Sequence, residues 1–289
     1  MSAALPNRSA GTAGRATMTA RAFGLYLLLF LGVGLTVLPF VWVISGALRT
    51  SEDFRRDPGA WLPNAVTLDN FARLFAANGF STYLTNSLIV AAIVVFGNVI
   101  AASMAGFALA KLDFAGKRVA FGVVMIALMV PFSATFVPQF VVTVNLGLVD
   151  TLAGIALPSV VLPISIFIMR QFALGIPDEL LEAARLDGAS EGRIFFGIFL
   201  PLAGAALAAT TIMSFLASWN NFIWPLIVAQ RAQTYTLPVG LATLSQSAAN
   251  VTDYGLILAG AVVVMLPVLV LFILLQRYFV QGISAAGFK

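Results

Sequence analysis

Apolar residues in this chain form six long runs that contain no aspartate, glutamate, lysine or arginine. Each run can supply the roughly 20 apolar residues that a helix needs to cross the ~30 Å hydrocarbon core of a bilayer. The pattern therefore predicts an all-α polytopic membrane protein with six transmembrane helices. The runs cover residues 22–48, 74–110, 119–149, 151–169, 194–230 and 254–276.

A seventh charge-free stretch, residues 232–252, is too polar to be a span. It contains ten hydroxyl or amide side chains, whose groups would lack partners in lipid. We expect residues 49–82 and 232–253 to be the two substantial loops on the outer side. Such loops often carry function, although a solvated connector would have the same composition.

Composition supports the membrane assignment. Of the 289 residues, 60% are hydrophobic and 10% are charged, whereas a soluble domain has about 45–50% apolar and about 25% charged residues. The chain has no cysteine and no histidine, which excludes thiolate chemistry, disulfides and histidine-bound metals. The net charge of +4 is distributed as in a membrane protein, so we expect lipid rather than nucleic acid as the partner of this surface.

Lysine and arginine predict the orientation. Eleven of the 16 lie in the two tails and in the loops after the second and fourth runs, and five lie in the other loops. The positive-inside rule then places both termini in the cytoplasm. The predicted layout is a cytoplasmic N-terminal tail (residues 1–22), a six-span domain (residues 23–277) and a cytoplasmic C-terminal tail (residues 278–289).

The predicted spans lack aspartate, glutamate, lysine and arginine, which carriers coupled to protons or ions usually keep inside the membrane. The chain also lacks the G-x-x-x-x-G-K-[ST] phosphate-binding loop of ATPases. We therefore expect a non-enzymatic chain whose energy for active transport comes from a partner.

Two further patterns concern helix packing. Gly97, Ala101 and Ala105 recur at four-residue spacing in the second run, together with Gly106, which predicts close approach of neighbouring helices. Prolines inside the runs predict bent helices. These prolines are Pro131, Pro138, Pro158, Pro163 and Pro267.

The loop between the fourth and fifth runs, residues 176–201, predicts a helix–glycine–helix elbow. Asp178 is placed to cap a first helix, Gly188 to end it and Ser190 to cap a second helix. Leucine and phenylalanine side chains on an exposed elbow would be suited to a groove in another protein.

The same loop carries a motif. Glu182-Ala183-Ala184 is followed after three residues by Gly188 and, after nine more, by Ile198-Phe199-Leu200-Pro201. This spacing resembles the signature of ABC importer permeases and departs from it at no position. The resemblance implies the type I ABC importer permease fold, in which the elbow is the coupling helix that docks into a separate ATPase.

By this resemblance, Glu182 and Gly188 would fix the elbow, and Leu180, Leu181 and Ala184 would face the ATPase. The full set of expected coupling residues is Leu180, Leu181, Glu182, Ala183, Ala184, Gly188, Ile198, Leu200 and Pro201.

Weaker motifs are similar to the carbohydrate-uptake branch, near the second permease of maltose-type systems. They include Asn86-Ser87-Leu88, Trp219-Asn220-Asn221-Phe222 and Thr236-Leu237-Pro238. Aromatic faces beside amides suit a polyol, so Trp219, Asn220 and Asn221 are candidates for the substrate path. Interfacial anchoring of the tryptophan and interhelical hydrogen bonding by the asparagines are the alternatives.

The resemblance implies the partners as well. They are a second permease subunit, two ATP-binding-cassette ATPases that hold ATP and Mg²⁺, and an extracytoplasmic solute-binding protein, at a bacterial plasma membrane. This chain itself would bind no cofactor and no metal. The alternatives are a permease for another polar solute, such as polyamine or phosphate, a self-contained secondary carrier or channel, and a membrane scaffold.

Overall fold

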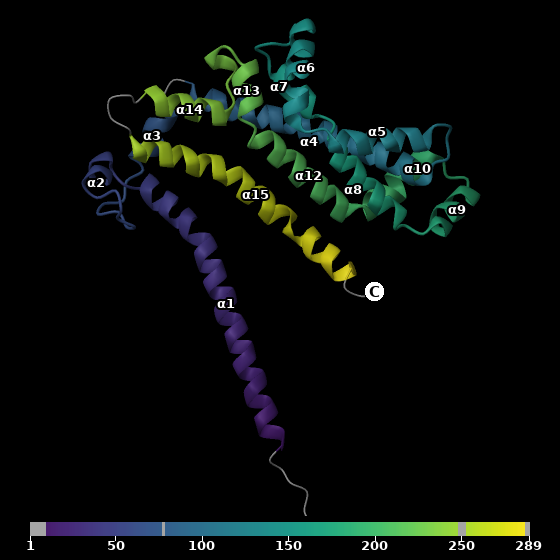
Figure 1. The fold of residues 1–289 in the computed structure, drawn as a ribbon, viewed down its shortest axis with the longest axis horizontal. Coiled ribbons are helices and arrows are strands. Elements are labelled where there is room, and N and C mark those ends of the chain that lie inside the picture. The colour runs from purple at the N-terminus through teal and green to yellow at the C-terminus, as the bar shows by residue number, and fades with distance from the viewer. Residues whose placement is uncertain (1–9, 77–78, 248–252, 287–289) are drawn as a thin grey trace, which may run out of the picture. The chain divides into compact units, whose positions relative to one another are not determined.

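The computed structural model describes residues 10–76, 79–247 and 253–286, and every regular element in these ranges is a helix (Figure 1). The chain divides into two compact units. The first comprises Met1–Ala72 and Asp253–Val262, and the second comprises Arg73–Thr252 and Val263–Lys289. Residues 1–9 and 287–289 of the predicted tails lie outside the described residues.

The first unit contains α1 (Ala10–Ala47), α2 (Ser51–Arg56) and the start of α3 (Asp69–Ala76). Its loop is organised around Arg49, which is fully buried. The guanidinium donates to the Asp53 carboxylate (3.0 Å) and to the carbonyls of Ala60 (3.1 Å) and Asp57 (2.7 Å). The hydrogen bond from Arg49 lowers the pKa of Asp53 to about 2. Because a buried arginine requires such partners, this predicted loop is a folded element rather than a solvated connector.

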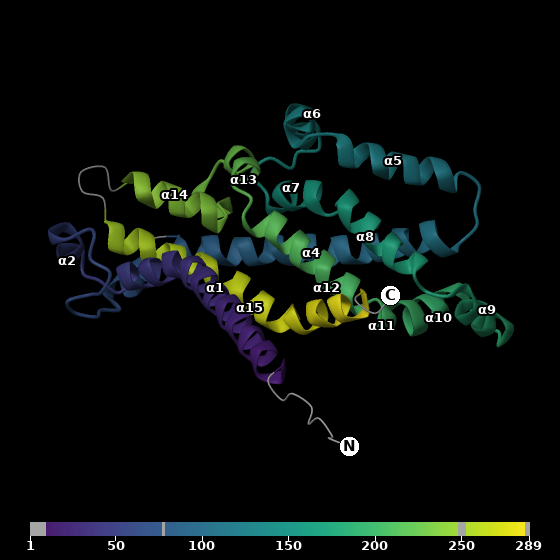
Figure 2. The same ribbon diagram turned by 60° about the horizontal axis from the view of Figure 1, so that its bottom comes forward.

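The second unit is built around α4, which packs most extensively against α8 and α12 (Figure 2). The predicted close packing of small residues is confirmed at two points. A Cβ on Gly97 would lie 2.5 Å from Val160, and a Cβ on Gly106 would lie 2.5 Å from Met169. The helices of this unit up to α8 are α4 (Phe80–Lys111), α5 (Lys117–Met129), α6 (Phe132–Asn145), α7 (Leu152–Ala156), the 3₁₀ helix η1 (Leu157–Ser159) and α8 (Pro163–Leu174).

The remaining helices carry the predicted elbow and the last spans. They are α9 (Asp178–Leu186), α10 (Glu191–Ile194), the π-helical turn η2 (Phe195–Phe199), α11 (Leu200–Leu202), α12 (Gly204–Trp219), α13 (Ile223–Val228), the 3₁₀ helix η3 (Ala232–Thr234), α14 (Leu237–Ser247) and α15 (Tyr254–Ala286). Helix α15 begins in the first unit and continues into the second after Val262. The polar stretch predicted as a loop thus contains a helix, α14, and its residues 248–252 lie outside the described part.

Six membrane spans are consistent with these helices. Three helices are long and apolar enough to cross alone: Ala22–Ala47 of α1, α4, and Tyr254–Tyr278 of α15. Three bent pairs supply the others: α5 with α6 (106°), α7–η1 with α8 (41°), and α10–α11 with α12 (80°). Prolines lie at the first two breaks, at Pro131 and Pro163, where their missing N–H group interrupts the helical hydrogen bonds.

Candidate functional site

The elbow, residues 176–201, turns at Gly188. The Gly188 amide donates to the Arg185 carbonyl (3.0 Å) and the Ala189 amide to the Ala184 carbonyl (2.9 Å). This pair of bonds is a Schellman motif, which satisfies the last carbonyls of α9 and requires a left-handed residue. Gly188 supplies it with a φ of +80°. The predicted helix stop is confirmed.

A second set of contacts fixes the outgoing arm. The Ser190 hydroxyl accepts from the Arg193 amide (3.4 Å), so the predicted cap of α10 is confirmed. The Arg185 guanidinium donates to the Glu191 carboxylate across the turn (2.7 Å). This hydrogen bond raises the pKa of Arg185 above its usual value. Backbone hydrogen bonds, the Ser190 hydroxyl and an ion pair together therefore fix the conformation of the elbow.

The end of the motif lies in an irregular turn. The Leu200 amide donates to the Phe195 carbonyl, five residues back, which makes η2 a π-helical turn. Pro201 follows and offers no amide, and a proline inside a regular α-helix would clash with the carbonyl four residues earlier. The wider turn accommodates it, and the chain then bends by 80° before α12. Such π turns are frequent at functional sites.

One face of the elbow is packed into the protein. Phe195 and Phe199 contact Phe107 of α4, with ring centroids 5.5 and 5.0 Å apart. Leu181 is 1% exposed and Ile194 fully buried in the same apolar cluster. The expectation that Leu181 faces a partner is therefore wrong, because its side chain lies in the core of this chain. Of the other expected coupling residues, Ala184, Ile198 and Leu200 are partly buried against this cluster.

The opposite face is exposed. Leu180 is 45%, Leu186 89% and Phe196 69% exposed, although large apolar side chains favour burial. Glu182, Ala183, Gly188 and Pro201 are exposed as well. Leu186 and Phe196 were not among the expected coupling residues. Their positions beside the motif could have indicated them in the sequence. Only the fold shows that Leu186 and Phe196 are exposed while Leu181 is buried.

The first turn of α9 is held by a residue that lies outside the motif. Lys111, the last residue of α4, donates to the Ile176 carbonyl and to the Asp178 carboxylate, both at 2.6 Å. The prediction that Asp178 caps the helix is wrong: Pro177 is the N-cap residue and makes no side-chain cap. The hydrogen bond from Lys111 instead lowers the pKa of Asp178. In the sequence, Lys111 was visible only as one of the basic residues that set orientation.

The three candidate path residues differ in their surroundings. Trp219 is 1% exposed, stacks on Phe215 with centroids 5.4 Å apart, and donates from Nε1 to the Val264 carbonyl of α15 (2.9 Å). Trp219 is therefore a packing residue that joins α12 to α15. Interhelical hydrogen bonding was the alternative expected for the neighbouring asparagines, and here the tryptophan makes such a bond. Asn220 is exposed, and Asn221 accepts from the Trp224 amide (3.4 Å).

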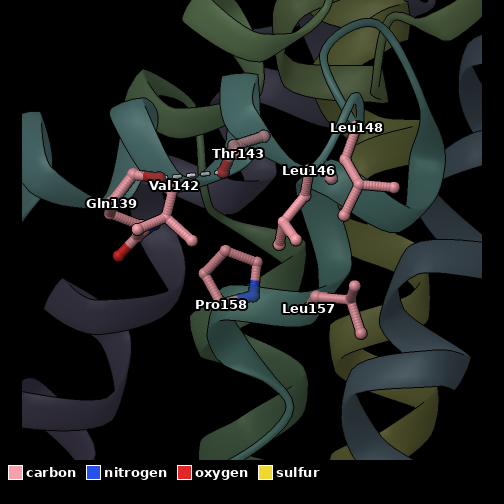
Figure 3. A pocket seen from close by; sticks show the side chains of 8 residues that line it. Gln139, Val142, Thr143, Leu146, Leu148, Leu157 and Pro158 are labelled. Carbon is pink, nitrogen blue, oxygen red and sulfur yellow. Dashed lines mark hydrogen bonds between the residues drawn. The ribbon is translucent and has the colours of Figure 1, made fainter.

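A cavity of about 370 Å³ lies elsewhere, between α6 and the α7–η1 segment. Figure 3 shows that apolar side chains surround it and that Thr143 bonds within its own helix, to the Gln139 carbonyl at 2.9 Å. None of the three candidate path residues lines it. Its lining residues are Gln139, Val142, Thr143, Leu146, Leu148, Gly154, Leu157 and Pro158.

Two of the weaker motifs meet at the far end of α4. The Asn86 amide donates to the carbonyls of Gln233 (2.8 Å) and Tyr235 (2.9 Å). The neighbouring Ser87 hydroxyl accepts from the Leu237 amide (2.7 Å). The bonded residues are 147 to 150 positions apart in the sequence. Their shared role, holding the segment before α14, therefore emerges only from the fold.

The same segment is bound from a second side by Asp150. Its carboxylate accepts from the Thr234 hydroxyl, from the Gln230 amide (3.0 Å), and from the side chain and amide of Arg231. These donors, the Thr234 hydroxyl foremost, hold the pKa of Asp150 well below its usual range. Across the described ranges there is no group of three or more acidic, histidine or cysteine residues suited to a metal ion.

Comparison with known proteins agrees with the family that the elbow motif resembles. Residues 97–285 match the family described as binding-protein-dependent transport system inner membrane component. The chain is 42% identical, over 88% of its length and 92% of the relative's, to the arabinooligosaccharides transport system permease protein AraQ of Halalkalibacterium halodurans. It is 32% identical to the trehalose transport system permease protein SugB of Mycobacterium tuberculosis, over 89% and 94% of the two chains.

A solved structure shares the fold. The crystal structure of a bacterial ABC transporter involved in the import of the acidic polysaccharide alginate contains a chain that superposes with a TM-score of 0.78. The match covers 96% of this chain and all of that chain at 22% identity.

Proposed function

Because the chain belongs to the family of binding-protein-dependent transport system inner membrane components, which are non-catalytic permease subunits, we propose that it carries an oligosaccharide across the plasma membrane. Each of the two relatives described above is named for a sugar system. The absence of aspartate, glutamate, lysine and arginine from the six apolar runs also favours an uncharged, hydroxyl-rich cargo, since charged groups inside the membrane are usually paired with a counter-charge.

The elbow is the observation that carries the proposal. The nine-residue helix α9 is held at both ends and presents Leu180 and Leu186 to its surroundings, and η2 presents Phe196 beside them. Preorganised apolar side chains on a rigid element reduce the entropic cost of docking. An elbow built in this way suits a groove on an ATPase. Coupling requires that this groove bind the elbow with different affinity in its two states.

The complete importer in this proposal contains a second permease, two ATPase subunits that hold ATP and Mg²⁺, and an extracytoplasmic solute-binding protein. The tails, residues 1–22 and 278–289, and the elbow face the cytoplasm, and the domain of residues 23–277 spans the membrane. Asn220 and Asn221 are the remaining candidates for contact with the solute, while Trp219 supports them from the packed side.

A pull-down from native membranes in mild detergent tests the proposal. The tagged chain should recover a second six-span permease and a P-loop ATPase, identified by mass spectrometry. The double variant Leu186→Ser, Phe196→Ser should lose the ATPase and keep the permease. Leu62→Ser, which changes an exposed leucine of the other unit (77% exposed), is the control and should keep both.

A chain that is recovered alone and still supports uptake would contradict the proposal and favour a self-contained carrier. If the complex is recovered instead, its binding protein, titrated with oligosaccharides, phosphate and polyamines, identifies the class of solute.

A further inference from the structure

The coupling elbow has two anchors on α4, and they lie on one face of that helix. Phe107 contacts the aromatic rings of η2, and Lys111 binds the start of α9. Residues four positions apart on a helix are neighbours on its surface. The last turn of α4 therefore holds both arms of the elbow, and Figure 2 shows α9 and α10 at this end of the second unit.

The contact of Lys111 is not an ordinary surface ion pair. The lysine side chain is 4% exposed, whereas that of Asp178 is 74% exposed. A buried ammonium group is costly unless it is paired and hydrogen-bonded. Here it has the Asp178 carboxylate as one partner and the Ile176 carbonyl as the other, so its position defines where α9 begins.

The contact does not stabilise α9 as a helix. A positive charge beside a helix N-terminus opposes the helix dipole, which favours acidic residues there. The N-cap, Pro177, also makes no side-chain bond to the first turn. What Lys111 supplies is a fixed point between α4 and the first turn of α9.

We propose that Lys111 is a positioning residue for coupling: its ammonium group, bound to the Ile176 carbonyl and the Asp178 carboxylate, sets the place of α9 relative to α4. The inference rests on the proposed function, because it takes α9 to be the element that meets the ATPase. Without this contact, α9 remains attached through the apolar packing of Leu181 and Ala184, and the place of its first turn against α4 is no longer fixed.

The test uses the complete importer, purified with its ATPases and binding protein and reconstituted in liposomes. Lys111→Met keeps the aliphatic volume and removes the charge. Removing one partner of an ion pair destabilises the fold strongly when the remaining charge is buried. Here the remaining Asp178 side chain is 74% exposed and becomes hydrated. We expect normal assembly and a fall of about tenfold in ATP hydrolysis stimulated by the binding protein, as for loss of a charge-assisted contact.

Two matched variants separate positioning from a general effect of charge. Lys111→Arg can donate to both oxygens and should restore the stimulated rate. Lys117→Met removes a neighbouring lysine that donates to the Ala110 carbonyl (3.3 Å) and to Asp113 (3.5 Å), and it should behave as the wild type. Basal hydrolysis, measured without the binding protein, reports on the ATPase subunits themselves.

Gly188→Val in the same assay separates the two proposals. If Gly188→Val loses stimulation and Lys111→Met keeps it, Lys111 has no positioning role and the proposed function stands. If both keep it, the elbow does not couple and the proposed function fails. Should Lys111→Met not assemble, Asp178→Ala decides. It removes the carboxylate partner from the exposed side and leaves the bond to the Ile176 carbonyl, so stimulation should fall part of the way. Full stimulation in Asp178→Ala would overturn the inference, in which both oxygens set the place of α9.

Discussion

At the scale of single residues, the elbow depends on a backbone conformation at Gly188. An added Cβ would meet no atom within 4 Å, yet the φ of +80° lies in the left-handed region. A substitution there acts through strain, of roughly 1–2 kcal/mol for residues with a Cβ, and not through a clash. Asparagine tolerates this region, and β-branched residues do not.

We therefore expect Gly188→Val to insert normally and to lose most ATP hydrolysis stimulated by the binding protein, while Gly188→Asn retains most of it. Membrane-fraction blots and the liposome assay measure the two properties. Equal rates in the valine and asparagine variants would show that the turn does not matter for coupling.

At the scale of elements, polar clusters at the two ends of α4 fix segments that are distant in the sequence. Lys111 holds α9 at one end, and Asn86 and Ser87 hold the segment before α14 at the other. Asn98 contributes between them, because it is fully buried and bonds Ser165 of α8 (2.8 Å). In a low-dielectric environment such satisfied networks specify one packing arrangement. We interpret α4 as the element that organises this unit.

The Asp150 cluster leads to a prediction about pH. Since the pKa of the folded-state carboxyl lies below its unfolded value of about 3.9, its stabilising effect is complete above about pH 5 and is lost as the pH falls through the folded value. Asp150→Asn should lower the Tm at pH 7, and the difference from the wild type should shrink below about pH 4. Asparagine also tolerates the positive φ of 60° at this position.

Thermal unfolding of the detergent-solubilised protein at several pH values measures this. Asp113→Asn is the control, because Asp113 is fully exposed and has one long ion pair at 3.5 Å. A constant Tm difference across the pH range would mean that Asp150 acts through its shape and not through its charge.

At the scale of the whole molecule, a single chain leaves much of its apolar surface open. Only 33% of the most apolar window of α4 is buried, although α4 is the central helix of its unit. Apolar surface of this extent suits lipid and a second membrane subunit, where close packing of small residues drives association. This surface is better suited to one subunit of a multi-subunit transport path than to a complete pore made by one chain.

The orientation can be tested directly because the chain has no native cysteine. We expect Leu62→Cys to react with a membrane-impermeant maleimide in intact cells. Asp113→Cys, in the loop between α4 and α5, should react only after permeabilisation. Both side chains are well exposed, so accessibility reports the side of the membrane. The reverse labelling pattern would place the elbow away from cytoplasmic ATP.

Much of this architecture was determined by local sequence. The six apolar runs, the helix stop at Gly188, the Ser190 cap and the breaks at Pro131 and Pro163 depend on hydropathy and backbone chemistry, which act over a few residues. These features were predicted and the structure bears them out.

The tertiary structure alone decided which side chains face inward. Leu180 and Leu181 are adjacent and chemically identical, and only packing against Phe107 and its neighbours buries the second. The sequence around Trp219 is consistent with a substrate path, but in the fold its indole donates to the Val264 carbonyl. In the sequence Lys111 is one basic residue among many, and the fold alone pairs it with Asp178. The reason is physical: burial and pairing are properties of two segments together, and local sequence specifies only one of them.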